Sequence, residues 1–318
     1  MKINGNQVQN WKADTAASVL FYNSWFRNFA PRTFNETRDV TILRVRKYFA
    51  ELNYLVKFDG AALRSNPDTL SMLRMMTCPP IAKDRLIGLS GASSSLVGRM
   101  EKKKGLSPRM SKSDQDSNLA LIADVLIDMF DHEILPWLKR GTAPEDDEIE
   151  ISSLIIADRL SSSLANPIIR NAQEFRQLLT LETLLKSKGY TEVSKNIKDW
   201  KDFKPGEYGF RFNVRVFKTK SSTTNIPVDM IVMPFKYEDD EFPILIEAKS
   251  AGDFTNTNKR RKEEVTKFAQ LRKTYGDSVE FILYLCGYFG SDYLGYNAAE
   301  GIDWVWEHRT EDILKLID

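Results

Sequence analysis

The sequence predicts a mixed α/β (α+β) protein. An all-helical N-terminal lobe, residues 1–150, is expected to precede a domain, residues 151–318, whose core elements run in the order αβββαβ. Two observations support this prediction. Segments with helical apolar spacing, separated by Gly and Pro, fill the first half of the chain. The second half contains four runs of strand-forming residues, three of them between two helical segments and the fourth after the second helix.

The composition is that of an ordinary soluble globular protein, with 42% hydrophobic and 28% charged residues. Two cysteines and two histidines are too few for a disulfide framework, a zinc site or an imidazole-rich centre, so any metal is expected to be a hard cation held by carboxylates. The net charge of +1 argues against non-specific coating of nucleic acid, but not against a DNA enzyme with one basic cleft. Because neither a membrane span nor the apolar core of a signal peptide is present, we expect a cytoplasmic protein without membrane contact.

The helices expected in the first lobe are separated by proline and glycine. Pro31, Gly60 and the pair at 79–80 mark the breaks. The acidic stretch 144–150 is interpreted as the junction between the lobes. The expected helices span residues 8–30, 36–56, 67–76, 84–100 and 117–138.

A basic run, residues 99–112, lies between two of these helices and contains six basic residues and one acidic residue. Such a run is commonly a solvated loop, and it can also be a loop that contacts DNA phosphates. Lys102, Lys103, Lys104 and Arg109 are therefore candidate DNA contacts, with a solvated loop as the alternative.

Three charged residues, Asp229, Glu247 and Lys249, occur within an apolar β-hairpin at 227–250; we call them the charged triad. Glu247 and Lys249 share one face of the second strand because strand side chains alternate. Buried charges cost free energy unless something binds them, and two carboxylates beside an ammonium suit a divalent cation and a phosphodiester. Other acidic-x-Lys triplets in the chain do not follow an apolar strand. A solvated hairpin with a stray ion pair is the alternative.

The elements around the hairpin complete the core order. A helix at 167–188 and a strand at 210–217 are expected before it, and a helix at 257–275 and a strand at 279–285 after it. This αβββαβ order, together with the charged triad, resembles the core of the PD-(D/E)xK nucleases. The order of elements does not depend on the triad, so the order and the triad support this prediction independently.

Glu182 is predicted near the centre of the apolar face of the helix at 167–188. A carboxylate there is rare unless it is paired, protonated or a ligand. In the PD-(D/E)xK fold the first helix often lends an acid to the metal site, so Glu182 is a candidate fourth catalytic residue. An ion pair with an arginine is the alternative, and Glu174 is a second candidate for the same role.

Longer motifs point to one family. They lie at residues 11–14, 22–31, 79–89, 225–229, 246–264, 285–289, 293–296 and 298–306. This pattern, which extends over about residues 11–309, resembles the XamI-like family of type II restriction endonucleases. The stretch after Lys249 is the most specific part of it.

The resemblance implies a Mg²⁺-dependent enzyme that cleaves double-stranded DNA at a short palindromic site and leaves 5′-phosphate ends. Asp229 and Glu247 would hold the metal, and Lys249 would orient the attacking water. A palindromic site implies a homodimer. A cognate DNA methyltransferase would act on the same DNA site rather than bind the enzyme. The alternatives are a PD-(D/E)xK nuclease of the junction or repair type and a non-cleaving DNA-binding protein on the same scaffold.

Candidate DNA contacts follow the triad directly. Arginine can grip the O6 and N7 atoms of guanine, and a basic cluster can equally clamp phosphates. The candidates are Ser250, Asn256, Asn258, Lys259, Arg260 and Arg261.

Overall fold

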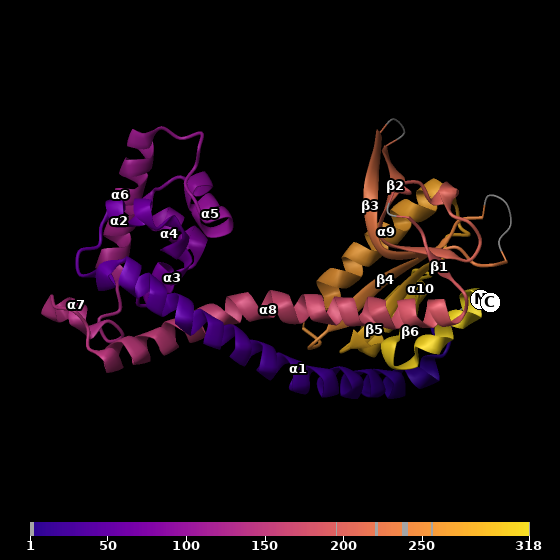
Figure 1. Ribbon diagram of the computed structural model, residues 1–318. Helices are drawn as coiled ribbons and strands as arrows, with labels where there is room; N and C mark the ends of the chain where they lie inside the picture. Colours follow the sequence, from indigo (N-terminus) through magenta and orange to yellow (C-terminus); the bar gives the residue numbers. More distant parts are fainter. Residues whose placement is uncertain (1–2, 195, 220–221, 237–240, 256, 318) are drawn as a thin grey trace. The chain divides into compact units, whose positions relative to one another are not determined.

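The chain forms two compact units (Figure 1). The computed structural model describes residues 3–194, 196–219, 222–236, 241–255 and 257–317. The sheet unit consists of Met1–Phe29 and Arg170–Asp318, and the helical unit consists of Ala30–Ile169. This division differs from the expected boundary after residue 150, because the first 29 residues group with the sheet and residues 151–169 with the helices.

Two long helices each contribute to both units. Helix α1 spans Val8–Glu51 and continues through Pro31, so the break expected there between two helices is wrong. A proline inside a helix removes one backbone hydrogen bond, at a cost of about 3 kcal/mol, which tertiary packing can outweigh. Ala30 and Thr33, on either side of Pro31, are buried. No described helix, α1 included, combines the length and the apolar content that a membrane crossing requires.

Helix α8 spans Asp146–Ser187 and therefore begins well before the helix expected at 167–188. The acidic stretch taken as a junction forms its start, with Asp146, Asp147 and Glu148 in the first turn. Carboxylates at this end are stabilised by the helix dipole and by the free backbone N–H groups. An acidic run before an apolar segment thus marks a helix start here, not a linker.

The helical unit packs around one continuous apolar core. The expected helix at 84–100 is divided at Gly91, whose φ of +66° ends α4 in the left-handed conformation. The expected helix at 117–138 ends earlier, and Pro136 opens a new helix because proline fits the first turn. The helices of this unit, besides α1 and α8, are α2 Gly60–Ser65, α3 Leu70–Leu73, α4 Lys83–Ser90, α5 Ser94–Lys103, α6 Lys112–Met129 and α7 Pro136–Arg140, with 3₁₀ turns at Asn53–Leu55, Pro67–Thr69 and Arg74–Met76.

The described residues of the sheet unit form a six-stranded sheet in the order β1-β2-β3-β4-β5-β6. β2, β3 and β4 are antiparallel neighbours. β1 is parallel to β2. β4, β5 and β6 are parallel to one another. The strands are β1 Thr191–Glu192, β2 Glu207–Thr219, β3 Ser222–Val232, β4 Ile244–Ala251, β5 Phe281–Gly287 and β6 Asp303–Trp306. The elements α8, β2, β3, β4, α9 (Thr257–Tyr275) and β5 reproduce the expected αβββαβ order, whereas β1, α10 (Ser291–Ala299) and β6 were not expected.

Each face of the sheet carries its own apolar core, and helices cover both faces (Figure 1). On one face, α9 (Thr257–Tyr275) and α10 (Ser291–Ala299) contribute buried side chains such as Leu271 and Leu294. On the other face, α8 contributes Leu181, and the C-terminal 3₁₀ helix (Glu307–Ile313) and α11 (Leu314–Ile317) complete the core. Burial of both sheet faces explains why the central strands are nearly continuous apolar runs.

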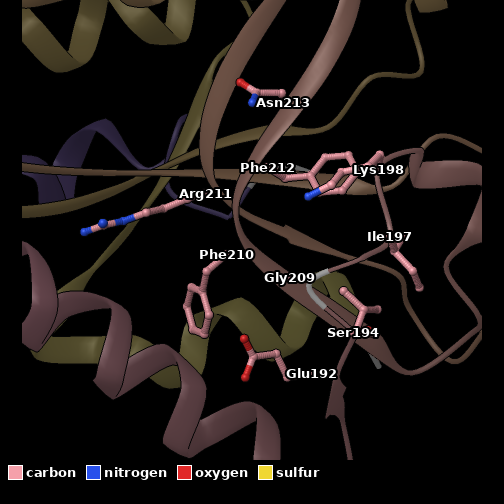
Figure 2. A pocket seen from close by; sticks show the side chains of 10 residues that line it. Glu192, Ser194, Ile197, Lys198, Gly209, Phe210, Arg211, Phe212 and Asn213 are labelled. Atoms are coloured by element: carbon pink, nitrogen blue, oxygen red, sulfur yellow. The ribbon is translucent and has the colours of Figure 1, made fainter.

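Strand β2 is distorted at Arg211, a non-glycine residue with a φ of +48°. The β2–β3 register pairs Phe210 with Met230 and Phe212 with Val228, and the intervening Arg211–Asp229 pair is absent from the register of the described strands. A pocket of about 470 Å³ lies beside this distortion (Figure 2). Its described lining comprises Glu192, Val193, Ser194, Ile197, Lys198 and residues 209–213. None of the charged triad is among the described residues that line this pocket.

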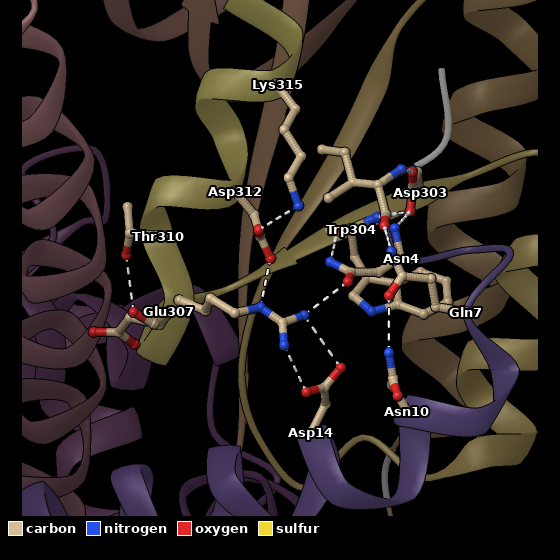
Figure 3. A network of polar contacts seen from close by, with 12 residues as sticks. Asn4, Gln7, Asn10, Asp14, Asp303, Trp304, Glu307, Thr310, Asp312 and Lys315 are labelled. Carbon is tan, nitrogen blue, oxygen red and sulfur yellow. Dashed lines mark hydrogen bonds and ion pairs between the residues drawn. The ribbon is translucent and has the colours of Figure 1, made fainter.

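A polar network attaches the first residues of the chain to the sheet (Figure 3). The buried carboxylate of Asp303 accepts hydrogen bonds from the backbone N–H groups of Ile3, of Asn4 at 3.1 Å and of Gly5 at 2.8 Å. The Arg309 guanidinium donates to Asp14 Oδ1 at 2.8 Å. These contacts are the physical reason why residues 1–29 group with the sheet, a relationship between chain ends that no local pattern reveals.

Replacing Asp303 with alanine is expected to lower the free energy of unfolding by about 2–4 kcal/mol, because four buried N–H groups, those of Ile3, Asn4, Gly5 and Trp304, would lose a charged acceptor. Urea denaturation measures the change. Asp277→Ala is the control, since the Asp277 side chain is 86% exposed and its removal should cost at most about 0.5 kcal/mol. Equal effects of the two substitutions would contradict this role of Asp303.

Candidate active site

The charged triad lies where β3 and β4 separate. The backbone ladder between these strands pairs Val232 with Ile244 and ends at Met230–Ile246. Beyond that point, the N–H of Ala248 donates to Asp229 Oδ2 at 2.8 Å, so a side chain replaces the backbone acceptor. The opening between the strands is therefore bordered by Asp229 on one side and by β4 on the other.

Strand alternation directs the two charged residues of β4 toward α9. Leu245 packs in the core beneath α9, so Glu247 and Lys249, two and four residues later, face the same side. Ile246 enters the opposite core. The small Ala248 lies between the two charged side chains in sequence and faces the other way, as the sequence predicted.

Glu247 is the most buried member of the triad, with 8% of its side chain exposed. Its Oε1 atom accepts hydrogen bonds from Lys249 Nζ and Lys267 Nζ, each at 2.8 Å. Its Oε2 atom is buried and accepts no hydrogen bond from any described residue. A buried carboxylate oxygen without a partner is costly, and a bound cation would remove that cost.

Electrostatics at the site favour a proton or a cation on Asp229. Burial, followed by the nearby Glu247 carboxylate, raises the pKa of Asp229 to about 6. Burial alone would lower the pKa of Lys249, but the Glu247 carboxylate overrides that effect and raises it above the ordinary value. Lys249 is therefore a charged ammonium at neutral pH, and Asp229 is a carboxylate that gains from a positive neighbour.

The donor set suits a hard divalent cation. Asp229 and Glu247 offer carboxylate oxygens, and Mg²⁺ is commonly held by one or two carboxylates together with substrate phosphate and water. No cluster of three or more His, Cys, Asp or Glu side chains suited to a metal occurs among the described residues. The two carboxylates fit a metal site that DNA phosphate would complete.

The apolar face predicted around Glu182 is only half correct. Leu178 and Leu185 are buried as predicted, together with Gln177 and Leu181, whereas Phe175 and Leu179, which the prediction put on that face, are exposed. Glu182 is about one-fifth exposed and forms an ion pair with Lys186 at 2.6 Å, not with an arginine. The helix turns its polar Gln177 inward, so its inner face is shifted from the face that the apolar pattern predicted.

Glu174 is the α8 carboxylate that acts on Asp229, since its charge contributes to the raised pKa of Asp229. Glu174 Oε1 also accepts from Arg211 at 3.2 Å. The Arg211 side chain is 77% exposed, and Figure 2 shows it pointing away from Ser194 and Ile197. Arg211 is thus a cation at the rim of the site that the sequence did not indicate.

The structure describes the side chains of only some of the candidate DNA contacts that follow the triad. Ser250 is partly buried at the end of β4. Asn256 lies outside the described residues, and the side chains of Asn258, Lys259 and Arg260 in α9 also lie outside them. The Arg261 guanidinium stands 4.1 Å from the ring centroid of Tyr296, so it is packed against an aromatic ring and not simply solvated.

The candidate DNA contacts of the basic run lie in the helical unit. Lys102 and Lys103 end α5, and Lys104 is its left-handed C-cap with a φ of +55°. These three lysines and Arg109 are exposed. The run is thus a helix end followed by a loop, and its charges are open to solvent.

Two residues of the site lie far from the triad in sequence. Lys267, on α9, bonds Glu247 and also the carbonyl oxygen of Pro227 at 2.8 Å. Gln177, on α8, is 1% exposed and donates to the carbonyl oxygens of Tyr284 at 3.2 Å and Lys249 at 3.4 Å. The spacing of Lys267 four residues before the buried Leu271, on the inner face of α9, was the available indication for Lys267.

Comparison with known proteins identifies the class of this protein. The family model of the XamI restriction endonuclease matches residues 53–306, and the chain belongs to this family. The type II restriction enzyme SalI of Streptomyces albus G is 46% identical over 312 residues, which cover 98% of each chain. No solved structure gives a significant match. The resemblance seen in the sequence is confirmed, and the chain is a type II site-specific deoxyribonuclease, an enzyme class that generally uses divalent metal ions.

The raised pKa of Asp229 predicts a pH-dependent stability of the metal-free protein. Folding favours the protonated carboxyl, so this contribution is fully present below the unfolded pKa of about 3.9 and is lost as pH rises through about 6. Asp229→Asn, which cannot ionise, should raise the free energy of unfolding at pH 8 by on the order of 1–2 kcal/mol, and by less at pH 5. Urea denaturation with EDTA tests this; the same difference at both pH values would contradict it.

Proposed function

We propose that the sheet unit is a PD-(D/E)xK catalytic domain in which Asp229 and Glu247 hold Mg²⁺ and Lys249 assists hydrolysis of a DNA phosphodiester. The observation that carries this proposal is Glu247 Oε2, a buried oxygen without a hydrogen-bond donor among the described residues, beside a carboxylate of raised pKa. The αβββαβ order and the two-carboxylate donor set support it.

A bound Mg²⁺ would lower the pKa of a coordinated water and offset charge on the phosphate. Lys249, released from Glu247, orients that water and stabilises negative charge on the phosphoryl oxygens as it attacks. The new bond joins the water oxygen to phosphorus as the water loses a proton to solvent, the bond from phosphorus to the 3′ oxygen breaks, and the 3′ oxygen takes up a proton from solvent. The products are a 5′ phosphate and a 3′ hydroxyl.

DNA contacts are proposed on both units. Lys102, Lys103, Lys104 and Arg109 contact backbone phosphates, which their exposure permits. The start of α9, with Arg261, contacts the DNA near the cut, and the segment after Ser250 approaches the backbone. A short palindromic target then requires a homodimer in which each protomer cleaves one strand. A cognate methyltransferase would protect the same DNA site without binding the enzyme.

Digestion of a sequenced plasmid, with and without EDTA, followed by mapping of the ends, tests this proposal. Discrete fragments with 5′-phosphate ends in Mg²⁺, and none in EDTA, are the expected result. Fragment ends that read the same on both strands would support the palindromic target. Cleavage that persists in EDTA, or ends that carry 3′ phosphates, would refute the assigned mechanism.

A further inference from the structure

We propose that Lys267 is a positioning residue, which holds the open ends of β3 and β4 at the separation that the catalytic cation requires; this inference rests on the proposed metal site. Its ammonium lies 2.8 Å from Pro227 O on β3 and 2.8 Å from Glu247 Oε1 on β4. Pro227 precedes Asp229 by two residues, so one side chain connects the backbone beside one proposed ligand to the side chain of the other.

The need for such a bridge follows from the strand pairing. The β3–β4 ladder ends at Met230–Ile246, so backbone hydrogen bonds do not fix the distance between the strands at Asp229 and Glu247. The described connections there are the Ala248 N–H to Asp229 and the two bonds of Lys267. Lys267 is anchored in turn by α9, whose neighbouring Phe268 and Leu271 are buried against the sheet.

Lys249 and Lys267 both donate to Glu247 Oε1, but their roles differ. Lys249 must leave Glu247 to reach the water and the phosphate. Lys267 keeps its bond to Oε1 when that happens, because its second bond, to Pro227 O, holds the ammonium in place. A buried carboxylate oxygen left without a donor is unfavourable, which also keeps Lys267 in place. With Oε1 held by Lys267, Oε2 stays directed at the cation.

A plain alternative is that Lys267 is only a charge buried in an ion pair, with 20% of its side chain exposed. The two roles predict opposite changes in metal affinity. Removing a positive charge beside a cation site should by itself strengthen cation binding. Removing a bridge that aligns the ligands should weaken it, since loss of groups that orient metal ligands typically costs about 10–100-fold in metal affinity or activity.

The experiment measures Mn²⁺ binding to the full-length protein from the loss of the free-ion EPR signal, with no DNA present. The variants are wild type, Lys267→Met, Lys267→Arg and Asp229→Ala. Lys273→Met is the matched control, an exposed lysine on the same helix. We expect Lys267→Met to bind Mn²⁺ about 10-fold or more weakly, Lys267→Arg to recover part of the affinity, and Lys273→Met to match wild type.

Unchanged or tighter binding by a folded Lys267→Met would overturn the inference. Should that variant fail to fold by circular dichroism, Lys267→Gln, which keeps a donor but not the charge, is judged by the same criterion. The Asp229→Ala arm separates the two levels of the argument. If Asp229→Ala binds Mn²⁺ as well as wild type, the metal site itself is wrong; if only Lys267→Met does, the site stands and the bridging role falls.

Discussion

Asp229→Ala is expected to lower the rate of DNA cleavage by on the order of 10³-fold or more, because it removes one of the two proposed metal ligands. The affinity for the target DNA should change little, since the proposed DNA contacts are basic residues other than the triad. Lys249→Met should act in the same way, as it removes the ammonium, bonded to Glu247, that we propose orients the attacking water. Single-turnover cleavage of a mapped target fragment measures the rate, and a gel-shift titration measures the affinity.

Asp277→Ala is the control for this prediction, because it removes a carboxylate of the same unit that is 86% exposed and distant in sequence from the triad. Its cleavage rate should equal that of wild type. Near wild-type cleavage by purified Asp229→Ala would remove Asp229 from the mechanism. A loss of DNA binding that matches the loss of cleavage would instead assign Asp229 to substrate binding.

Replacing Lys102, Lys103 and Lys104 together with alanine is expected to weaken DNA binding by on the order of 10–100-fold at physiological salt, similarly for all sequences. Each phosphate contact releases condensed counterions, so the slope of log affinity against log salt should become shallower by about 2–3. The three lysines are exposed at the end of α5, so the protein itself should remain folded. Titration of labelled DNA at several salt concentrations measures both quantities.

The matched control is the triple substitution of Lys47, Lys57 and Lys139, which are exposed in the same unit and carry the same total charge. Only a small, long-range electrostatic effect is expected there. If both triple variants have the same salt slope, the basic run is a solvated helix end and not a DNA contact.

The sequence contained enough to predict the core of the sheet unit and the charged triad. Strand alternation fixes which residues of β4 share a face. The Asp on the preceding strand distinguishes this acidic-x-Lys triplet from the others in the chain. The sequence pattern predicted the ends of helices less reliably where tertiary packing outweighs local conformational preference. Pro31 lies inside α1, and the acidic run before α8 is a helix start.

The rest of the site could not be read from local patterns, because it depends on which helix face meets the sheet. The apolar Phe175 and Leu179 point outward on α8, while Gln177 points inward, so the apolar face predicted around Glu182 was only half correct. On α9, Glu264 and Lys267 are spaced to lie on the same face as the buried Leu271. Two charges on an inner helix face indicate a site, but only the fold shows that one of them reaches Glu247.

The most direct test of the account is the position of the metal in crystals of the protein with its target DNA and Mn²⁺, located by anomalous diffraction. The account predicts a peak bonded to Glu247 Oε2 and to an oxygen of Asp229, with a phosphate oxygen completing the coordination. A peak held by Glu182 or by other residues, with Glu247 still bonded only through its lysines, would contradict it.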